Sequence, residues 1–234
     1  MQRMLSLALA ALVTVGHAAS ALADTSRPVA AQFSFTASDA AGKERTPAEF
    51  HLWRTADRVE TDHDGRAEVW QRDTEGTRLT RVFHADSRMV EYSPGELKAM
   101  RIEPRWEALA SMLDPADLSG LPAAGSTEVF GQVASIREGV IGEEQVTVWW
   151  IDALSIPARY ERTGPNGRVR FTLESLADSA PSGWPLVSDA AWREYVRIDA
   201  ADLGEMEDDA FVRKLQRMDA GSRFGHGHHG HEHR

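Results

Sequence analysis

The segment Gly167-Arg168-Val169-Arg170-Phe171-Thr172-Leu173 decides the fold, because its apolar and polar residues alternate more regularly than anywhere else in the chain. Successive side chains of a β-strand point to opposite faces of the sheet, so the three apolar residues of this segment would face a core. The turn sequence Gly164-Pro165-Asn166-Gly167 leads into it, after another strand-like stretch around Tyr160. Together they predict an antiparallel hairpin.

Short alternating segments of the same kind lie on both sides of this hairpin. Their apolar residues include Phe33, Phe35, Phe50, Leu52, Val69, Leu79, Val82, Phe83, Met89, Val90, Tyr92, Val129, Val133, Ile136, Val146 and Val148. Turn sequences such as Asp64-Gly65 and Glu75-Gly76 separate them and suit tight hairpins. We therefore expect one large antiparallel sheet.

Two segments have the helical period instead. In the proline-rich middle of the chain, apolar residues from Trp106 to Leu113 are spaced i, i+3, i+4 and i+7, which predicts a short helix. Residues 208–218 predict a C-terminal helix. Its apolar side would consist of Phe211, Val212, Leu215 and Met218. The order of strands, helical interruption, strands and terminal helix indicates the α+β class.

The first 23 residues have the three parts of a secretory signal peptide. Arg3 supplies the positive charge, an apolar stretch follows, and Ala21-Leu22-Ala23 forms the A-x-A cleavage pattern. The apolar stretch is shorter than the roughly 20 residues of a membrane-spanning helix, and no later stretch approaches that length. We therefore expect a soluble periplasmic protein that is exported by its signal peptide and is not membrane-embedded.

Composition excludes several classes of protein. The chain has no cysteine, so it can have neither disulfides nor the cysteine-linked lipid of a bacterial lipoprotein. Its 36 acidic and 26 basic residues give a net charge of −10, which disfavours binding to nucleic acid. The G-x-S-x-G, H-E-x-x-H, P-loop and dinucleotide-binding motifs are missing, so we expect a binding protein and no enzyme.

Three segments carry a resemblance to a known family. They are Gln32-Phe33-Ser34-Phe35, the stretch 125–134, and Val148-Trp149-Trp150-Ile151-Asp152 with the proline-containing stretch 154–160 after it. These segments resemble the periplasmic lipoprotein-carrier superfamily, the LolA/LolB-like fold, over roughly residues 30–178. The resemblance implies a strongly curved sheet, an open half-barrel, with short helices on its concave side. It also implies a cavity for acyl chains or other apolar ligands.

Taken with the signal peptide and the composition of the C-terminal third, the resemblance predicts four parts of the chain. Residues 1–23 are the signal peptide, and 24–198 form the LolA-like antiparallel β domain. Residues 199–221 hold an acidic segment and the amphipathic helix, and 222–234 form a disordered His-rich tail outside the family pattern. The acidic segment is either a solvated helix start or a docking patch for another periplasmic or membrane protein.

The His-rich tail is the strongest chemical signal. Its five histidines are His226, His228, His229, His231 and His233. Neutral imidazole is a ligand for Zn, Cu and Ni, and the intervening glycines would let the backbone fold around an ion. We expect transition-metal binding by this tail as the main function. The alternative is a disordered polar tail without a metal in the cell.

Tryptophans suggest a second function. Trp53, Trp70, Trp149 and Trp150 would line the cavity of a curved sheet and bind an apolar ligand, such as a lipid or an acyl chain. Core packing is the other interpretation. Trp149 and Trp150 are adjacent in a strand, so they should point to opposite faces. The strand arginines, Arg54 among them, are expected on a solvated sheet face.

Overall fold

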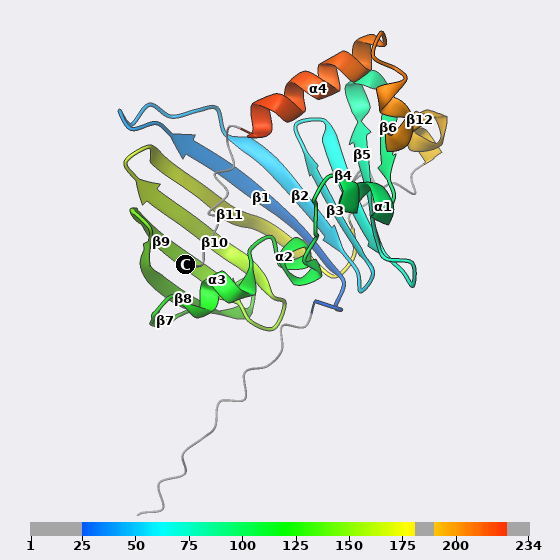
Figure 1. Ribbon diagram of the computed structural model, residues 1–234. Coiled ribbons are helices and arrows are strands. Elements are labelled where there is room, and N and C mark those ends of the chain that lie inside the picture. Colours follow the sequence, from blue (N-terminus) through cyan, green and yellow to red (C-terminus); the bar gives the residue numbers. More distant parts are fainter. Residues whose placement is uncertain (1–24, 181–189, 224–234) are drawn as a thin grey trace, which may run out of the picture.

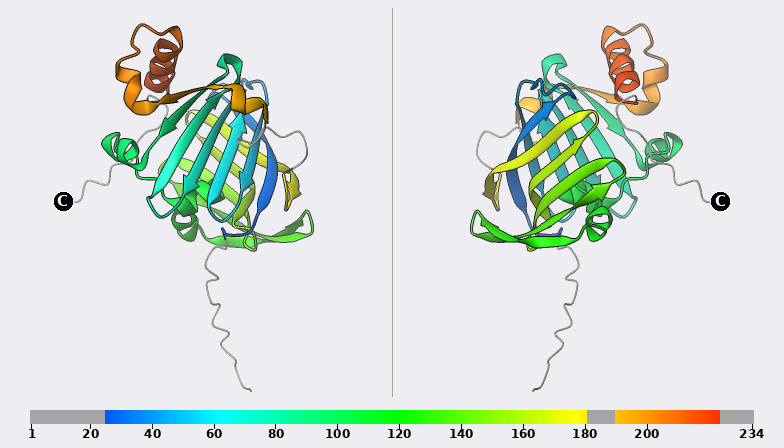
Figure 2. Two further views of the ribbon diagram at one scale, coloured as in Figure 1. Left: turned by 90° about the vertical axis from the view of Figure 1, so that its right-hand side faces the viewer. Right: turned by 90° about the vertical axis from the view of Figure 1, so that its left-hand side faces the viewer.

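The computed structural model describes residues 25–180 and 190–223 of the chain. The predicted signal peptide and the five histidines of the tail lie outside the described residues. Within them, one continuous sheet of twelve strands runs in the order β12-β6-β5-β4-β3-β2-β1-β11-β10-β9-β8-β7 (Figure 1). The sheet curves strongly without closing, as the two side views show (Figure 2).

The strands are short, and tight turns join most of them. Their bounds are β1 Val29–Ser38, β2 Ala48–Arg54, β3 Arg58–His63, β4 Arg66–Arg72, β5 Thr77–Phe83, β6 Arg88–Tyr92, β7 Ala123–Val129, β8 Gln132–Ile141, β9 Glu144–Ile151, β10 Ile156–Gly164, β11 Gly167–Ala177 and β12 Val196–Asp199. All neighbours pair antiparallel except β12, which runs parallel to β6. The one large antiparallel sheet expected from the alternation is thereby confirmed.

The N-terminal strand lies in the middle of the sheet. Strand β1 pairs with β2 on one side and with β11 on the other, so it joins the meander β1–β6 to the meander β7–β11. Residues far apart in sequence become cross-strand neighbours here, with Phe33 opposite both Phe50 and Leu173. This central position of β1 builds the site described below.

In the described part of the chain, four α-helices accompany the sheet. They are α1 Pro94–Ala99, α2 Trp106–Ser111, α3 Pro115–Ser119 and α4 Ala210–Arg223. Leu97 of α1, Trp106 and Ala110 of α2, and Phe211 of α4 are buried in the same apolar cluster as one face of the sheet. This is the concave face, and the views agree that the helices lie on its side (Figures 1 and 2). The expected open half-barrel with short helices on its concave side and a C-terminal helix is confirmed.

The C-terminal helix has the apolar face that its sequence predicts. Phe211, Val212 and Leu215 are buried, and Met218 packs against the same cluster. The helix begins at Ala210, where the Asp209 carboxylate accepts hydrogen bonds from the first backbone amides. It ends at Arg223, five residues beyond the predicted end.

Two details differ from the sequence-based expectation. The middle of the chain forms three short helices where one was predicted, because Pro94 and Pro115 each begin a helix of their own. The solvated position expected for Arg54 is wrong, since its side chain is 0% exposed. Its guanidinium donates hydrogen bonds to the Ala110 and Leu154 carbonyls, both at 2.6 Å, and so links α2 to the turn between β9 and β10.

Candidate functional site

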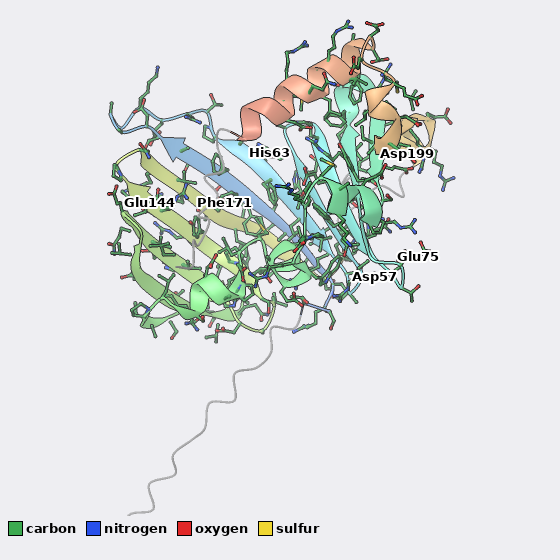
Figure 3. All side chains as sticks on the ribbon, in the orientation of Figure 1. Asp57, His63, Glu75, Glu144, Phe171 and Asp199 are labelled. Carbon is green, nitrogen blue, oxygen red and sulfur yellow. The ribbon has the colours of Figure 1, made fainter. Side chains whose placement is uncertain are left out.

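A cavity of about 580 Å³ opens on the concave face of the sheet, and we call it the concave cavity. Its lining side chains come from β1, β2, β3, β4, β5 and β11. They are Phe35, Phe50, Thr61, His63, Arg66, Ala67, Glu68, Arg81, Val82, Phe83 and Phe171. Figure 3 labels Phe171 and His63, which belong to strands on either side of β1 and β2.

Strand register explains why these residues meet. One cross-strand row runs Phe50, His63, Arg66 and Phe83, each directly opposite the next on β2, β3, β4 and β5. The neighbouring row runs Thr61, Glu68 and Arg81. Because side chains alternate between faces with a period of two, both rows point to the concave side. The cavity therefore has charged groups set among phenylalanines.

One wall of the concave cavity is aromatic. The rings of Phe35 and Phe171 lie 4.9 Å apart between centroids, and the Phe50 ring stands perpendicular to Phe171 at 6.3 Å. Phe33 lies buried behind them, 6.3 Å from Phe50. These are the separations that aromatic pairs prefer. Phe35, Phe50 and Phe171 remain only half-buried, so they offer apolar area to a ligand.

The opposite wall is polar and holds Arg81. Its Nη1 donates to the Asp219 carboxylate of α4 at 2.9 Å, and its Nε lies 3.7 Å from Glu68. Burial would lower the pKa of Arg81, but the charge of Asp219 and its hydrogen bond raise that pKa above its ordinary value. For the neighbouring Tyr92, burial has the opposite effect and raises the pKa, while the charge of Arg81 acts to lower it. At neutral pH the cavity therefore contains a permanent guanidinium cation.

Helix α4 is attached over the end of the cavity where Phe83 lies. Phe83 packs edge-on against Phe211 of the helix, with 5.1 Å between ring centroids. Two ion pairs fix the helix further, Arg88 with Asp209 at 2.9 Å and Lys214 with Asp86 at 2.6 Å. A smaller pocket of about 170 Å³ lies under the helix and shares Arg66 and Phe83 with the concave cavity.

His63 adds a hydrogen-bonding imidazole ring to the polar wall. Its Nδ1 lies 2.9 Å from the Glu49 carbonyl oxygen, which can only accept, so Nδ1 carries the proton. The ring also lies 6.4 Å from Phe50. His63 thus joins the aromatic wall to the charged one, a role that its position in the sequence alone does not indicate.

The four tryptophans predicted to bind a ligand lie in different places. Trp70 and Trp150 face the concave side and are buried, with Trp150 packed against Leu118 and Leu121 near α3. Trp53 and Trp149 point to the opposite face, as their alternation with buried neighbours requires. Arg159 stacks over Trp149 there at 5.2 Å.

No tryptophan is among the described side chains that line the concave cavity. The ligand-binding role of these four residues stays a prediction, and the cavity wall is made of phenylalanine. Phe35, Phe50 and Phe171 occupy alternating positions that the sequence does reveal. What it does not reveal is that their three strands are neighbours.

The metal-binding histidines cannot be placed, since the tail lies outside the described residues. In residues 25–180 and 190–223, no group of three or more histidine, aspartate or glutamate side chains is arranged to hold a metal ion. The metal site of the tail stays a prediction. The same part of the chain contains no helix with the length and apolar character needed to cross a membrane.

Comparisons with known proteins place the fold in context. No family model and no curated protein matches the chain. Among solved structures, PNGF-II is similar at 10% identity and a TM-score of 0.40, over 76% of this chain and 32% of that one. The MucA/MucB complex of Pseudomonas aeruginosa is similar at 16% identity and a TM-score of 0.38, over 69% of this chain and 56% of that one.

A third solved structure is also similar to this chain. An outer membrane lipoprotein-sorting protein domain from Vibrio parahaemolyticus matches at 13% identity and a TM-score of 0.30, over 68% of this chain and 87% of that one. A lipoprotein-sorting domain is thus among the solved structures that are similar to this chain. At these TM-scores, none of the similar structures says what this chain binds.

Proposed function

We propose that this protein is a periplasmic, non-enzymatic binding protein that carries an apolar chain, such as that of a lipid, in the concave cavity. The observation that supports this most strongly is the half-buried cluster of Phe35, Phe50 and Phe171 on the wall of a 580 Å³ space. Ligand pockets of proteins range from about 300 to 1,000 Å³ and combine apolar walls with a few polar groups.

The hydrophobic effect supplies the driving force for such binding. Apolar area removed from water stabilises a complex by roughly 25 cal/mol per Å². The three half-buried phenylalanines lie on a concave surface, where a chain can cover the exposed part of all of them at once. A flexible alkyl chain fits an irregular aromatic wall better than a rigid ligand, because its torsions adapt to the rings. Export by the signal peptide is part of the same proposal.

Native mass spectrometry of protein purified from the periplasm of its host tests this function. The wild-type protein should carry a lipid or fatty-acid adduct, or should take one up on incubation with dodecanoate. The double variant Phe50→Ala/Phe171→Ala should lose most of the adduct, because both apolar surfaces are removed.

Phe130→Ala is the matched control for that experiment. Phe130 is 51% exposed in the turn between β7 and β8 and does not line the concave cavity. This variant should bind like the wild type. A wild-type protein that stays free of ligand after incubation, or a double variant that binds equally well, would contradict the proposed function.

Metal binding by the tail is a second candidate, favoured by five histidines within residues 226–233. Titration calorimetry with Zn²⁺, Cu²⁺ and Ni²⁺ on the mature protein, with and without residues 225–234, is the test. The tail should account for the binding, since imidazole is the ligand these metals share. Equal binding by the shortened protein would exclude the tail as the site.

A further inference from the structure

We infer that the ligand of the concave cavity is a long-chain carboxylate, whose head group binds Arg81 in place of Asp219. This inference rests on the proposed function and names the chemical class of the ligand. Its starting point is the place of Arg81 at the polar end of a cavity whose other wall is phenylalanine.

The Arg81 side chain already binds a carboxylate. Asp219 accepts a hydrogen bond from Nη1 at 2.9 Å, while the second acid, Glu68, lies 3.7 Å from Nε. A guanidinium has five N–H donors in a planar fork that matches a carboxylate. A ligand carboxylate in the position of Asp219 would therefore make the same charge-assisted contact.

Asp219 can leave because it belongs to a separate element. It lies near the end of α4, whereas Glu68 and Arg81 lie opposite each other on β4 and β5. Two other ion pairs and the Phe83–Phe211 contact hold the helix in place. Displacing the Asp219 side chain therefore does not require the helix to detach.

A second cation lies beside the first. Arg66 lines both the concave cavity and the smaller pocket under α4, and its own ion pair with Asp64 is exposed and long, at 3.6 Å. Exposed pairs of this kind contribute little free energy. Arg66 is thus available to the head group as well, on the strand next to Arg81.

The hydrogen bond of Arg81 explains why an anion is favoured over a neutral head group. With Asp219 in place, Nη1 of Arg81 donates to a carboxylate at 2.9 Å, while Glu68 lies farther away, 3.7 Å from Nε. When the Asp219 side chain turns away, this Nη1 loses its charged acceptor in a partly buried site. A ligand carboxylate replaces that acceptor with a second charge-assisted hydrogen bond, whereas an alcohol offers only a weaker, neutral one.

The test compares dodecanoate with 1-dodecanol, which has the same chain and no charge, by calorimetry on the mature full-length protein. Wild-type protein should bind dodecanoate about tenfold more tightly than 1-dodecanol. Asp219→Asn should raise dodecanoate affinity severalfold and leave dodecanol unchanged, because the internal competitor is removed. Arg81→Met should abolish the preference between the two ligands.

Asp209→Asn, at the N-terminal cap of the same helix, is the control. It weakens the ion pair with Arg88, which does not line the cavity, and asparagine keeps the helix cap. Dodecanoate affinity should be unchanged. If both ligands bind equally and Asp219→Asn changes neither, the inference is overturned while the proposed function stands. If neither ligand binds to the wild type, both are overturned.

Discussion

At the scale of single residues, charged groups hold the fold and define the cavity in ways that charge counts do not reveal. Arg54, Arg81 and Arg159 all lie on strands and look alike in the sequence. Arg54 is buried and donates hydrogen bonds to backbone carbonyls, and Arg81 forms an ion pair with Asp219 of α4. Arg159 forms an ion pair with Glu161 on the convex face. The surroundings of an arginine therefore determine whether it stabilises the fold or supplies a charge to the cavity.

Replacing Arg54 should be costly. Arg54→Met would leave the Ala110 and Leu154 carbonyls without their charged donor, which destabilises the fold by about 3 kcal/mol. Urea denaturation monitored by tryptophan fluorescence gives this value. Arg78→Met removes only exposed ion pairs with Asp73 and Glu75, so the urea concentration at the midpoint of unfolding should stay almost unchanged. Equal losses in the two variants would contradict the structural role of Arg54.

The lowered pKa of Glu161 should make the stability of the protein depend on pH. Burial would raise its pKa, but hydrogen bonds from Arg159 and Arg170 and the charge of Arg168 hold it below the ordinary value of 4.5. Because the unfolded chain has the ordinary pKa, the folded protein binds fewer protons in the window below 4.5. The stabilisation is complete above that pH and is lost as the pH falls through the lowered pKa.

The variant Glu161→Gln isolates this effect. The wild type should unfold at a higher urea concentration than the variant at pH 7, and the difference should shrink at pH 3. Circular dichroism at both pH values is sufficient. A difference between the two proteins that does not change with pH would mean that the arginine cluster does not lower the pKa of Glu161.

At the scale of elements, turns and close backbone contacts determine the register that builds the cavity. Gly167 joins β10 to β11 with φ +121°, and a Cβ atom there would lie 2.0 Å from the Ser38 carbonyl oxygen of β1. The glycine therefore permits β11 to pair with β1. That pairing brings Phe171 next to Phe35.

Gly167→Ala should therefore destabilise the protein by more than about 2 kcal/mol, from the strained φ together with the clash. Gly142→Ala, in the turn between β8 and β9, is the matched control. It also has positive φ, at +63°, but a Cβ there meets nothing within 4 Å, so its cost should be smaller. Thermal unfolding of both variants compares them. Equal decreases in Tm for the two variants would show that β1 does not lie close enough to Gly167 to exclude a Cβ atom.

The strands themselves were predictable and their neighbours were not. Alternation identified most strands, and the helical period found the buried face of α4. Strand β12 was missed because Val196-Arg197-Ile198-Asp199 is only four residues long and ends where the acidic segment begins. Its parallel pairing with β6 depends on the chain returning from β11 to the far edge of the sheet, which no local pattern encodes.

At the scale of the whole molecule, the cavity arises from topology. The aromatic wall needs β1 between β2 and β11, and the polar wall needs α4 over β5. Each residue of the site is an ordinary strand residue when taken alone. The sequence therefore indicated four tryptophans as ligand-binding residues. The half-buried aromatic surface of the cavity consists of phenylalanines instead.

A crystal structure of the mature protein with dodecanoate is the most direct measurement of apolar binding in the concave cavity. The alkyl chain should lie against Phe35, Phe50 and Phe171, with the carboxylate at Arg81 and the Asp219 side chain turned away. A chain bound on the convex face beside Trp53 or Trp149, or an empty cavity at a saturating concentration of dodecanoate, would contradict binding in this cavity.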